Sequence, residues 1–316
     1  MEQPAIGRRA MLGAIAAAAG GAILGGCAAA KPAAGATSAG ASGTRPPYVR
    51  TISLAQWSLH RAVESGQTNT LGFAPAARRI YGIGAIEYVS TLYGADPGDA
   101  AYARQLRGIC DGEGVRSNLI MIDAEGDLGD PDPALRARAV ERHARWLEPA
   151  AALGCFCIRV NARSSGTPDE QRARCAEGIA ALAERAKALK LDIIVENHGG
   201  ISSDGAWMAS LMRAIGRPDV GTLPDFGNFR LSRTQNYDRY EGIRQMLPWA
   251  RDVSAKTYDF DEAGNETTID YARMFALLDA AGYSGPVGIE YEGKRLSERD
   301  GILATKRLVE RFGARA

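Results

Sequence analysis

The feature that most constrains the fold of this chain is an alternation of short apolar runs with amphipathic, Ala- and Arg-rich stretches, which begins near residue 49. Eight apolar runs of strand length lie at residues 51–59, 83–90, 115–122, 155–162, 191–198, 220–226, 251–258 and 286–293. Between them, apolar residues recur at helical spacing. Strands that alternate with helices predict an α/β fold with a parallel sheet, and eight such units are typical of a (β/α)8 TIM barrel.

A second regularity concerns the polar residue near the end of each apolar run. These residues are Gln56, Glu87, Asn118, Asn161, Glu196, Asp225, Lys256 and Glu290, and successive members lie 29 to 43 residues apart. A barrel of about 250 residues needs about 31 residues per strand–helix unit. An open doubly wound sheet is the alternative, but no Gly-rich phosphate loop follows the first run. We therefore predict a single barrel over residues 48–316.

The residues before this barrel have a different pattern. Residues 1–27 run from two adjacent arginines through an apolar segment to Leu-Gly-Gly-Cys, which is the order of regions in an export signal. The arginines resemble a twin-arginine signal, and Cys27 lies where a lipobox cysteine would be acylated; a plain Sec signal or a short membrane anchor is the alternative. Residues 28–47 lack large apolar side chains and predict a flexible tether. We expect an exported protein, either periplasmic or anchored to the membrane only through this lipid.

Composition excludes some classes of function. The chain is 46% hydrophobic and 24% charged, with a net charge of +1, which is a globular profile without the basic excess of a nucleic-acid-binding protein. Its three histidines are too few for a histidine-rich nuclease site. Of these, His143 lies in a charged helical stretch and is expected at the surface. The four cysteines after Cys27 are expected to be buried free thiols.

The late half of the chain places ionisable groups at four successive run ends, namely Glu196, Asp225, Lys256 and Glu290. In a TIM barrel, sites are built where the strands end. Carboxylates that converge there repel one another unless a metal cation or a lysine lies among them. Three carboxylates, with His198 as a candidate imidazole, suit Mn²⁺, Mg²⁺ or Zn²⁺.

Four motifs carry a family resemblance: IIVENHGG, LPDFGNF, VSAKTYDFDEAGNE and VGIEYEG. They resemble the sugar phosphate isomerase/epimerase family, which has a xylose isomerase-like barrel, and the resemblance spans most of residues 50–313. Members such as ketose 3-epimerases bind a divalent metal through a Glu-Asp-His-Glu set. The resemblance therefore implies that Glu196, Asp225 and Glu290 are metal ligands here.

The third ligand of that set is where this chain departs from the family. Members often have a Val-His-x-Lys pattern, and this chain has Ser254 at the histidine position. Three interpretations stay open. His198 supplies the imidazole, water or substrate fills the position, or the metal is lost and Lys256 neutralises the carboxylates.

The resemblance also implies a reaction, in which a proton moves at a carbon next to a sugar carbonyl through a metal-bound enediolate. Glu196 and Glu290 would act as the acid/base pair, and Lys256 would stabilise negative charge on a substrate oxygen. Candidate sugar contacts are Gln56, Trp57, His60, Glu87, Asn118, Arg159, Asn161 and Asn228. A keto-glycoside lyase or hydrolase on the same barrel and a non-catalytic saccharide-binding lipoprotein are the alternatives. The sequence leaves open the sugar, its phosphorylation and the oligomeric state.

Overall fold

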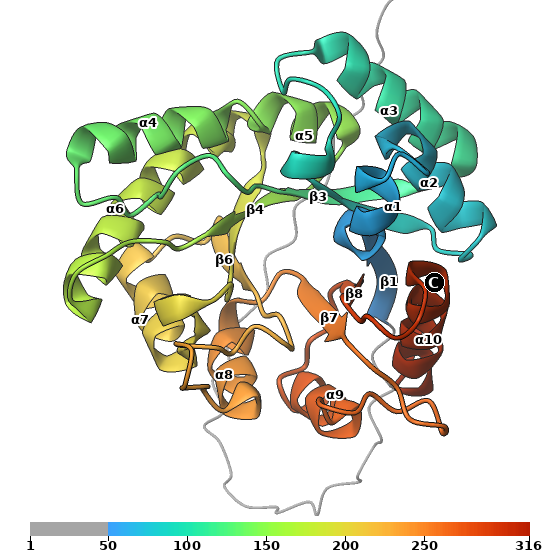
Figure 1. The fold of residues 1–316 in the computed structure, drawn as a ribbon. Coiled ribbons are helices and arrows are strands. Elements are labelled where there is room, and N and C mark those ends of the chain that lie inside the picture. Colours follow the sequence, from blue (N-terminus) through green and yellow to red (C-terminus); the bar gives the residue numbers. More distant parts are fainter. Residues whose placement is uncertain (1–49) are drawn as a thin grey trace, which may run out of the picture. The chain divides into compact units, whose positions relative to one another are not determined.

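The computed structural model describes residues 50–316, so the predicted export signal and tether lie outside the described residues and stay predictions. A ring of eight parallel strands forms the centre of the molecule (Figure 1). The strands are β1 (Arg50–Ala55), β2 (Ala85–Val89), β3 (Arg116–Met121), β4 (Cys157–Asn161), β5 (Asp192–Glu196), β6 (Val220–Leu223), β7 (Val253–Thr257) and β8 (Val287–Tyr291). They pair in the order β6-β5-β4-β3-β2-β1-β8-β7. Single bridges from Thr222 to Ala250 and from Asp225 to Ser254 close the ring between β6 and β7. The predicted (β/α)8 barrel is confirmed.

Helices surround the strands. They are α1 (His60–Glu64), α2 (Thr70–Arg79), α3 (Ala100–Glu113), α4 (Pro133–Ala144), α5 (Leu147–Leu153), α6 (Pro168–Ala186), α7 (Gly205–Ile215), α8 (Arg239–Met246), α9 (Tyr271–Ala280) and α10 (Glu298–Arg311). Short 3-10 turns are η1 (Gln56–Leu59), η2 (Ser90–Leu92), η3 (Lys187–Leu189), η4 (Gly200–Ser203) and η5 (Leu247–Trp249). Among the helices of residues 50–316, none combines the length and the apolar character needed to cross a membrane.

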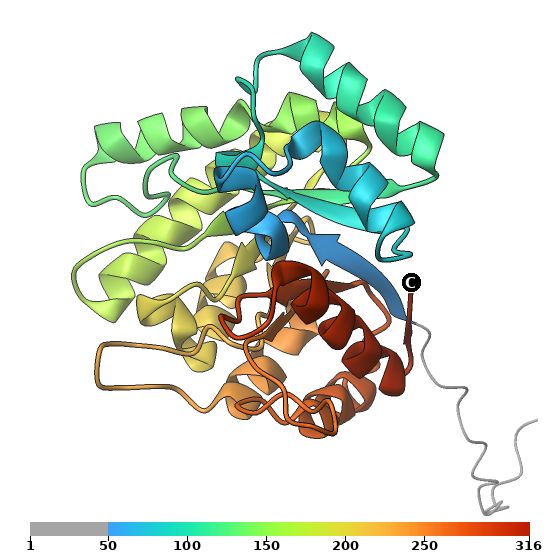
Figure 2. The same cartoon turned by 45° about the vertical axis from the view of Figure 1, so that its right-hand side comes forward.

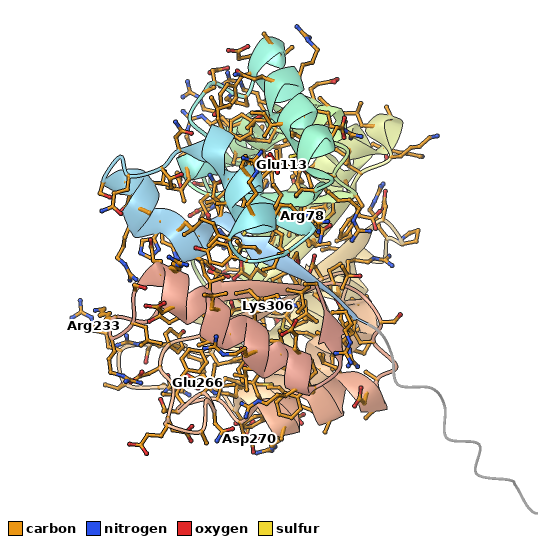
Figure 3. The ribbon with its side chains drawn as sticks, turned by 90° about the vertical axis from the view of Figure 1, so that its right-hand side faces the viewer. Arg78, Glu113, Arg233, Glu266, Asp270 and Lys306 are labelled. Carbon is orange, nitrogen blue, oxygen red and sulfur yellow. The ribbon has the colours of Figure 1, made fainter. Side chains whose placement is uncertain are left out.

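The two ends of the described chain meet at the amino-terminal end of the barrel. Figure 2 shows α10 beside the first strand, and the short strand β9 (Ala314–Arg315) that follows it pairs with Arg50 and Thr51. Charged side chains cover the solvent side of the outer helices (Figure 3). On this face Lys306 forms an ion pair of 2.6 Å with Glu310.

The strands bury both of their faces, which is why their sequences are nearly continuous apolar runs. In β3, Ile120 packs with the helices in the main core, whereas Leu119 and Met121 belong to a separate cluster. Because side chains alternate along a strand, this second cluster fills the inside of the barrel. Its members are Ala55, Val89, Leu92, Leu119, Met121, Cys157, Ile194 and Leu223. The four cysteines of the described chain are free and buried, as expected.

The predicted surface position of His143 is wrong, because this side chain is only 3% exposed. Its ring Nδ1 lies 2.8 Å from the backbone oxygen of Ala139. In α4, residues Arg136, Ala139, Val140 and His143 are buried together, at the spacing of one helix face. The sequence did not indicate this buried face, because one of its four residues, Arg136, is charged.

Candidate active site

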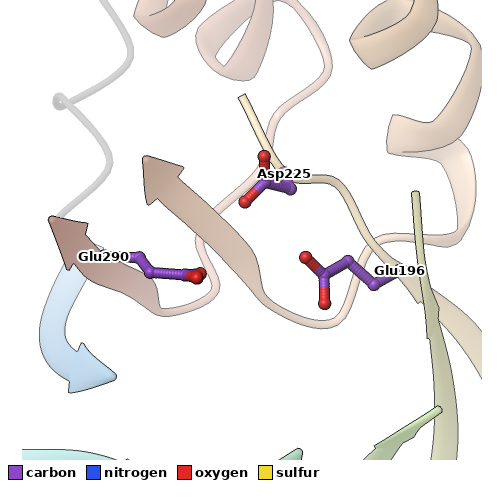
Figure 4. Close-up of side chains that lie close together, drawn as sticks. All are labelled: Glu196, Asp225 and Glu290. Atoms are coloured by element: carbon purple, nitrogen blue, oxygen red, sulfur yellow. The ribbon is translucent and has the colours of Figure 1, made fainter. Parts of the chain in front are cut away.

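Three carboxylates converge at the carboxyl-terminal mouth of the barrel. Glu196 ends β5, Asp225 follows β6 by two residues, and Glu290 lies in β8. One oxygen from each lies within 4.8 Å of the others, and all three side chains are buried. Figure 4 shows them turned toward one another. The strand ends predicted to form a site thus meet at one point.

A buried ammonium group compensates part of this charge. Lys256 Nζ lies 3.4 Å from Asp225 Oδ2, 3.1 Å from Glu290 Oε1 and 3.3 Å from Glu292 Oε1. Burial alone would lower the pKa of Lys256, but these carboxylates raise it well above its ordinary value. Lys256 in turn lowers the pKa of Glu290 against the effect of burial, with help from Ser254 Oγ, which donates to Glu290 Oε2 at 2.8 Å.

Arg159 supplies a second buried cation on the opposite side of the mouth. Its Nε lies 2.7 Å from Glu196 Oε2, and its Nη1 lies 2.9 Å from Asp123 Oδ1. Asn161 Nδ2 donates to the same Asp123 oxygen at 2.7 Å. Burial raises the pKa of Glu196 to about 7 even though Arg159 opposes this shift. The pKa values of Glu196 and Glu290 therefore shift in opposite directions. Arg159 and Asn161, predicted as sugar contacts, are therefore also engaged with protein groups.

The loop after β6 is locked onto the end of β5. Asn197 exchanges two hydrogen bonds with the backbone of Asp225, in which its Nδ2 donates at 3.0 Å and its Oδ1 accepts at 2.7 Å. Asp225 Oδ1 accepts the backbone N–H groups of Gly227 and Asn228, both at 2.7 Å. A side chain at Gly227 would meet Tyr258 Oη at 2.5 Å. These contacts fix Asp225 Oδ1, while Oδ2 lies 3.4 Å from Lys256 Nζ.

The donor set fits a divalent cation. Asp225 Oδ2 is buried and accepts no hydrogen bond, although buried carboxylate oxygens normally do, and its nearest cationic group is the Lys256 ammonium at 3.4 Å. Glu196 Oε2 also accepts no hydrogen bond in good geometry, but Arg159 Nε lies beside it at 2.7 Å. Three carboxylates are also the ligand type that hard and borderline divalent ions prefer. Glu196, Asp225 and Glu290 are thus the residues that could hold such an ion.

The fourth ligand stays a prediction. Within residues 50–316, the carboxylate group that could hold a metal includes no histidine. The Nδ1 atom of His198 lies 3.4 Å from Arg163 Nη2, and its backbone N–H donates to Ser202 Oγ at 2.9 Å. Ser254 uses its hydroxyl proton on Glu290.

Two of the predicted sugar contacts from the early half are engaged inside the protein. Gln56 is fully buried; its Nε2 donates to Thr70 Oγ1 at 3.1 Å, and its Oε1 accepts the Val89 backbone N–H at 3.0 Å. Glu87 accepts a hydrogen bond from Ser53 within the barrel. Burial raises the pKa of Glu87 to about 8.

The structure places Asn118 at the other end of the barrel. The pairing of β2 with β3 shifts between Ile86 and Glu87, whose partners are Ser117 and Leu119, so Asn118 is the extra residue of a bulge. Its side chain lines a cavity of about 670 Å³ among residues that start the strands. The third strand reaches the mouth with Asp123, which sequence reasoning missed, although it is the first polar residue after the run Leu119–Ile122.

The remaining predicted contacts do lie at the mouth. Trp57 Nε1 donates to Glu292 Oε1 at 2.7 Å, and the His60 ring stacks on Trp57 with centroids 4.6 Å apart. Asn228 Nδ2 donates to Glu196 Oε1 at 3.0 Å. Sequence reasoning also missed Glu292. It follows β8 directly, two positions after Glu290, and side chains two residues apart in extended chain point to the same side.

The fold agrees with what comparison with known proteins shows. The model of the xylose isomerase-like TIM barrel family matches residues 75–311. The chain belongs to this family.

Solved structures share the fold at low identity. L-ribulose 3-epimerase aligns with a TM-score of 0.66 and 18% identity, over 84% of this chain and 95% of that chain. A protein called IOLI, solved with a bound zinc atom, aligns with a TM-score of 0.66 and 13% identity, over 83% and 98%. A 3-keto-D-glucoside 4-epimerase from E. coli aligns with a TM-score of 0.62 and 15% identity, over 77% and 94%. At these identities the likeness establishes the fold alone.

Two curated relatives match a shorter segment. Over 80 residues the chain is 35% identical to the C-glycoside deglycosidase alpha subunit of Microbacterium trichothecenolyticum. Over 89 residues it is 32% identical to the subunit of the same name from Arthrobacter globiformis. These segments are 25% and 28% of this chain, and they span only 20% and 23% of the two relatives.

Proposed function

We propose that this protein is a sugar isomerase or epimerase that moves a proton at the carbon next to a carbonyl group. The observation that carries the proposal is the pair of buried carboxylates Glu196 and Glu290, which approach Asp225 from opposite sides (Figure 4). Their pKa values are displaced in opposite directions. Paired carboxylates of this kind divide into a proton donor and a proton acceptor near neutral pH.

The roles follow from the contacts of each residue. Glu290, with its lowered pKa, is ionised at neutral pH and takes the proton from the substrate carbon. Glu196 returns a proton from the opposite face, which inverts or relocates the stereocentre. Lys256 stabilises negative charge on a substrate oxygen. A divalent cation held by Glu196, Asp225 and Glu290 would polarise the carbonyl group.

A second candidate function is cleavage of a keto-glycoside. The observation that favours it is the segment similarity to C-glycoside deglycosidase alpha subunits. The first step is the same, because loss of a glycosidic substituent also begins with removal of a proton beside a carbonyl. The two functions differ only in whether the intermediate is reprotonated or expels its substituent.

Solvent-deuterium exchange separates these functions. The purified protein is incubated in D₂O with free ketoses and with methyl 3-keto-glucoside, after chelation and again with added Mn²⁺. We expect deuterium at the carbon next to the carbonyl, with activity lost on chelation and restored by Mn²⁺. Intact exchanged or epimerised sugar supports the epimerase, and release of methanol supports the cleavage reaction. Sugar binding without exchange under any metal would overturn both and leave a saccharide-binding protein.

A further inference from the structure

Two cavities flank the carboxylate group. The first, here the Trp57 cavity, has a volume of about 810 Å³ and is lined in part by Trp57, His60 and Glu292. The second, here the Asn228 cavity, has a volume of about 460 Å³ and is lined in part by Asn228 and Tyr258. Each lies within the range of roughly 300–1,000 Å³ that is usual for pockets holding a small ligand.

One buried atom, Lys256 Nζ, contacts a lining residue of each cavity. Lys256 Nζ lies 3.3 Å from Glu292 Oε1, on the side of the Trp57 cavity. The same nitrogen lies 3.5 Å from Asn228 Oδ1, on the side of the other cavity. The carboxylate group therefore adjoins both cavities, through Lys256 to Glu292 on one side and through Asn228 to Glu196 on the other.

Both cavities combine polar and aromatic residues. The Asn228 cavity is lined in part by Arg230, Arg239 and Tyr237. Polar residues such as Gln67 and Lys294 also line the Trp57 cavity. The Trp57 cavity contains an aromatic pair whose rings are nearly parallel, with 12° between their planes. The pair is held rigidly, since Trp57 Nε1 donates to Glu292 and His60 Nδ1 lies 2.7 Å from the backbone oxygen of Trp57. Such a preformed aromatic surface favours a group with a flat apolar face.

We propose that the substrate is a glycoside whose keto-sugar ring lies at the carboxylates and whose second group lies against the Trp57–His60 pair. This inference rests on the proposed action on a keto sugar and adds the class of substrate. The second group has a flat apolar face, which is either an aromatic ring or the face of a second pyranose. Trp57 and His60 thereby determine specificity for the substituent, whereas the carboxylates act on the ring.

The test compares three substrates that share a 3-keto-glucoside ring and carry a methyl, a phenyl or a second glucosyl group. The wild-type protein should bind the phenyl or the glucosyl compound more tightly than the methyl compound, by about three- to tenfold. Binding is measured by calorimetry on the Glu290→Gln protein, so that no turnover interferes, and kcat/KM is measured on the active protein. The preferred compound shows which flat group the cavity accepts.

Two substitutions at one position isolate the aromatic ring. Trp57→Phe and Trp57→Leu both lose the hydrogen bond to Glu292, but only Trp57→Phe keeps an aromatic face. We expect Trp57→Leu to lose the preference over the methyl compound, and Trp57→Phe to keep most of it. Phe156→Leu removes a ring that is 38% exposed at the opposite end of the barrel and serves as the control.

The outcomes separate this inference from the proposed function. Equal affinity for all three compounds, or an equal loss for all three in Trp57→Leu, would overturn the inference even if deuterium exchange is observed. Tight, Trp57-dependent binding of the phenyl or glucosyl compound without any exchange would support the glycoside site and overturn the proposed chemistry.

Discussion

The two halves of the barrel mouth are built from the same strand–helix unit, yet they contribute opposite chemistry. Strands β5 to β8 bring Glu196, Asp225, Lys256 and Glu290 to one point. The last residues of β1, β2 and β3 are Ala55, Val89 and Met121, which all belong to the apolar cluster inside the barrel. After β1 and β3, the groups that reach the mouth, such as Trp57 and Asp123, come from the segments that follow the strands, whereas Arg159 and Asn161 lie within β4.

This difference explains the electrostatics of the site. Burial is the largest cause of the raised pKa of both Glu196 and Asp225, each about 7. Lys256 and Arg159 then determine which carboxylate is ionised. The late half therefore supplies the carboxylates to which we assign the proposed proton transfer, and the strand ends of β1 to β3 are apolar.

The largest expected effect comes from neutralising a late-half carboxylate. Glu290→Gln keeps the shape of the side chain but removes the proton acceptor, so kcat should fall by about 10²- to 10⁴-fold. The rate of deuterium exchange measures this. Glu262→Gln, at an exposed position, is the matched control. Unaltered turnover in Glu290→Gln would remove Glu290 from the acid/base pair.

The next effect concerns the buried cation of the late half. Lys256→Met leaves Asp225 and Glu290 close together without their ammonium partner, so the free energy of unfolding should fall by about 3–5 kcal/mol. Urea unfolding at pH 7 measures this loss, which added Mn²⁺ should partly restore. Lys187→Met, whose side chain is 70% exposed, should change stability by less than about 0.5 kcal/mol. A loss in Lys256→Met as small as that would contradict the role of Lys256 as counter-charge.

A third prediction concerns the residue at which the chain departs from its family. Ser254→His adds an imidazole beside Glu290, and a fourth protein ligand should raise the affinity for Zn²⁺ or Mn²⁺ by roughly tenfold or more. Calorimetric titration of the metal-free protein measures the affinity. Ser254→Ala, which removes the hydroxyl without adding a ligand, should not increase it. Equal affinities for the His and Ala variants would argue against a metal at this position.

The last expected effect is a pH dependence of stability, and it arises below the mouth, in the early half. The pKa of Glu87 is raised by burial to about 8 from 4.5, and burial raises that of Asp252 as well. Between pH 4.5 and 8 the folded protein keeps a proton that the unfolded chain releases. Stability is therefore greatest below this window and falls as pH rises through it, by up to about 1.4 kcal/mol per pH unit for one group.

Glu87→Gln should flatten this slope, which urea unfolding at pH 5, 6, 7 and 8 measures. The exposed Glu64→Gln should leave the slope unchanged. If Glu87→Gln has the same slope as the wild type, Glu87 is ionised in the folded protein and the early half is more polar than its contacts indicate.

The sequence predicted much of the fold because each strand is buried on both faces and so appears as an apolar run of its own. Each of the eight runs overlaps one strand. The end of the third strand was predicted wrongly at Asn118. This residue interrupts the apolar run at a bulge, and the strand continues to Met121. In the sequence alone, a polar residue inside a run cannot be told from one at its end, because only the pairing between strands distinguishes the two positions.

The sequence by itself determined the barrel, the ionisable groups at the ends of the late strands and the departure at Ser254. These are local properties, set by apolar periodicity and by the residue type at each run end. Only the tertiary structure decided the partners: Arg159 with Glu196, Lys256 between Asp225 and Glu290, and Asn197 holding the loop after β6. Such contacts depend on the stagger and closure of the ring, which bring together groups far apart along the chain, and pKa values follow from those distances and from burial.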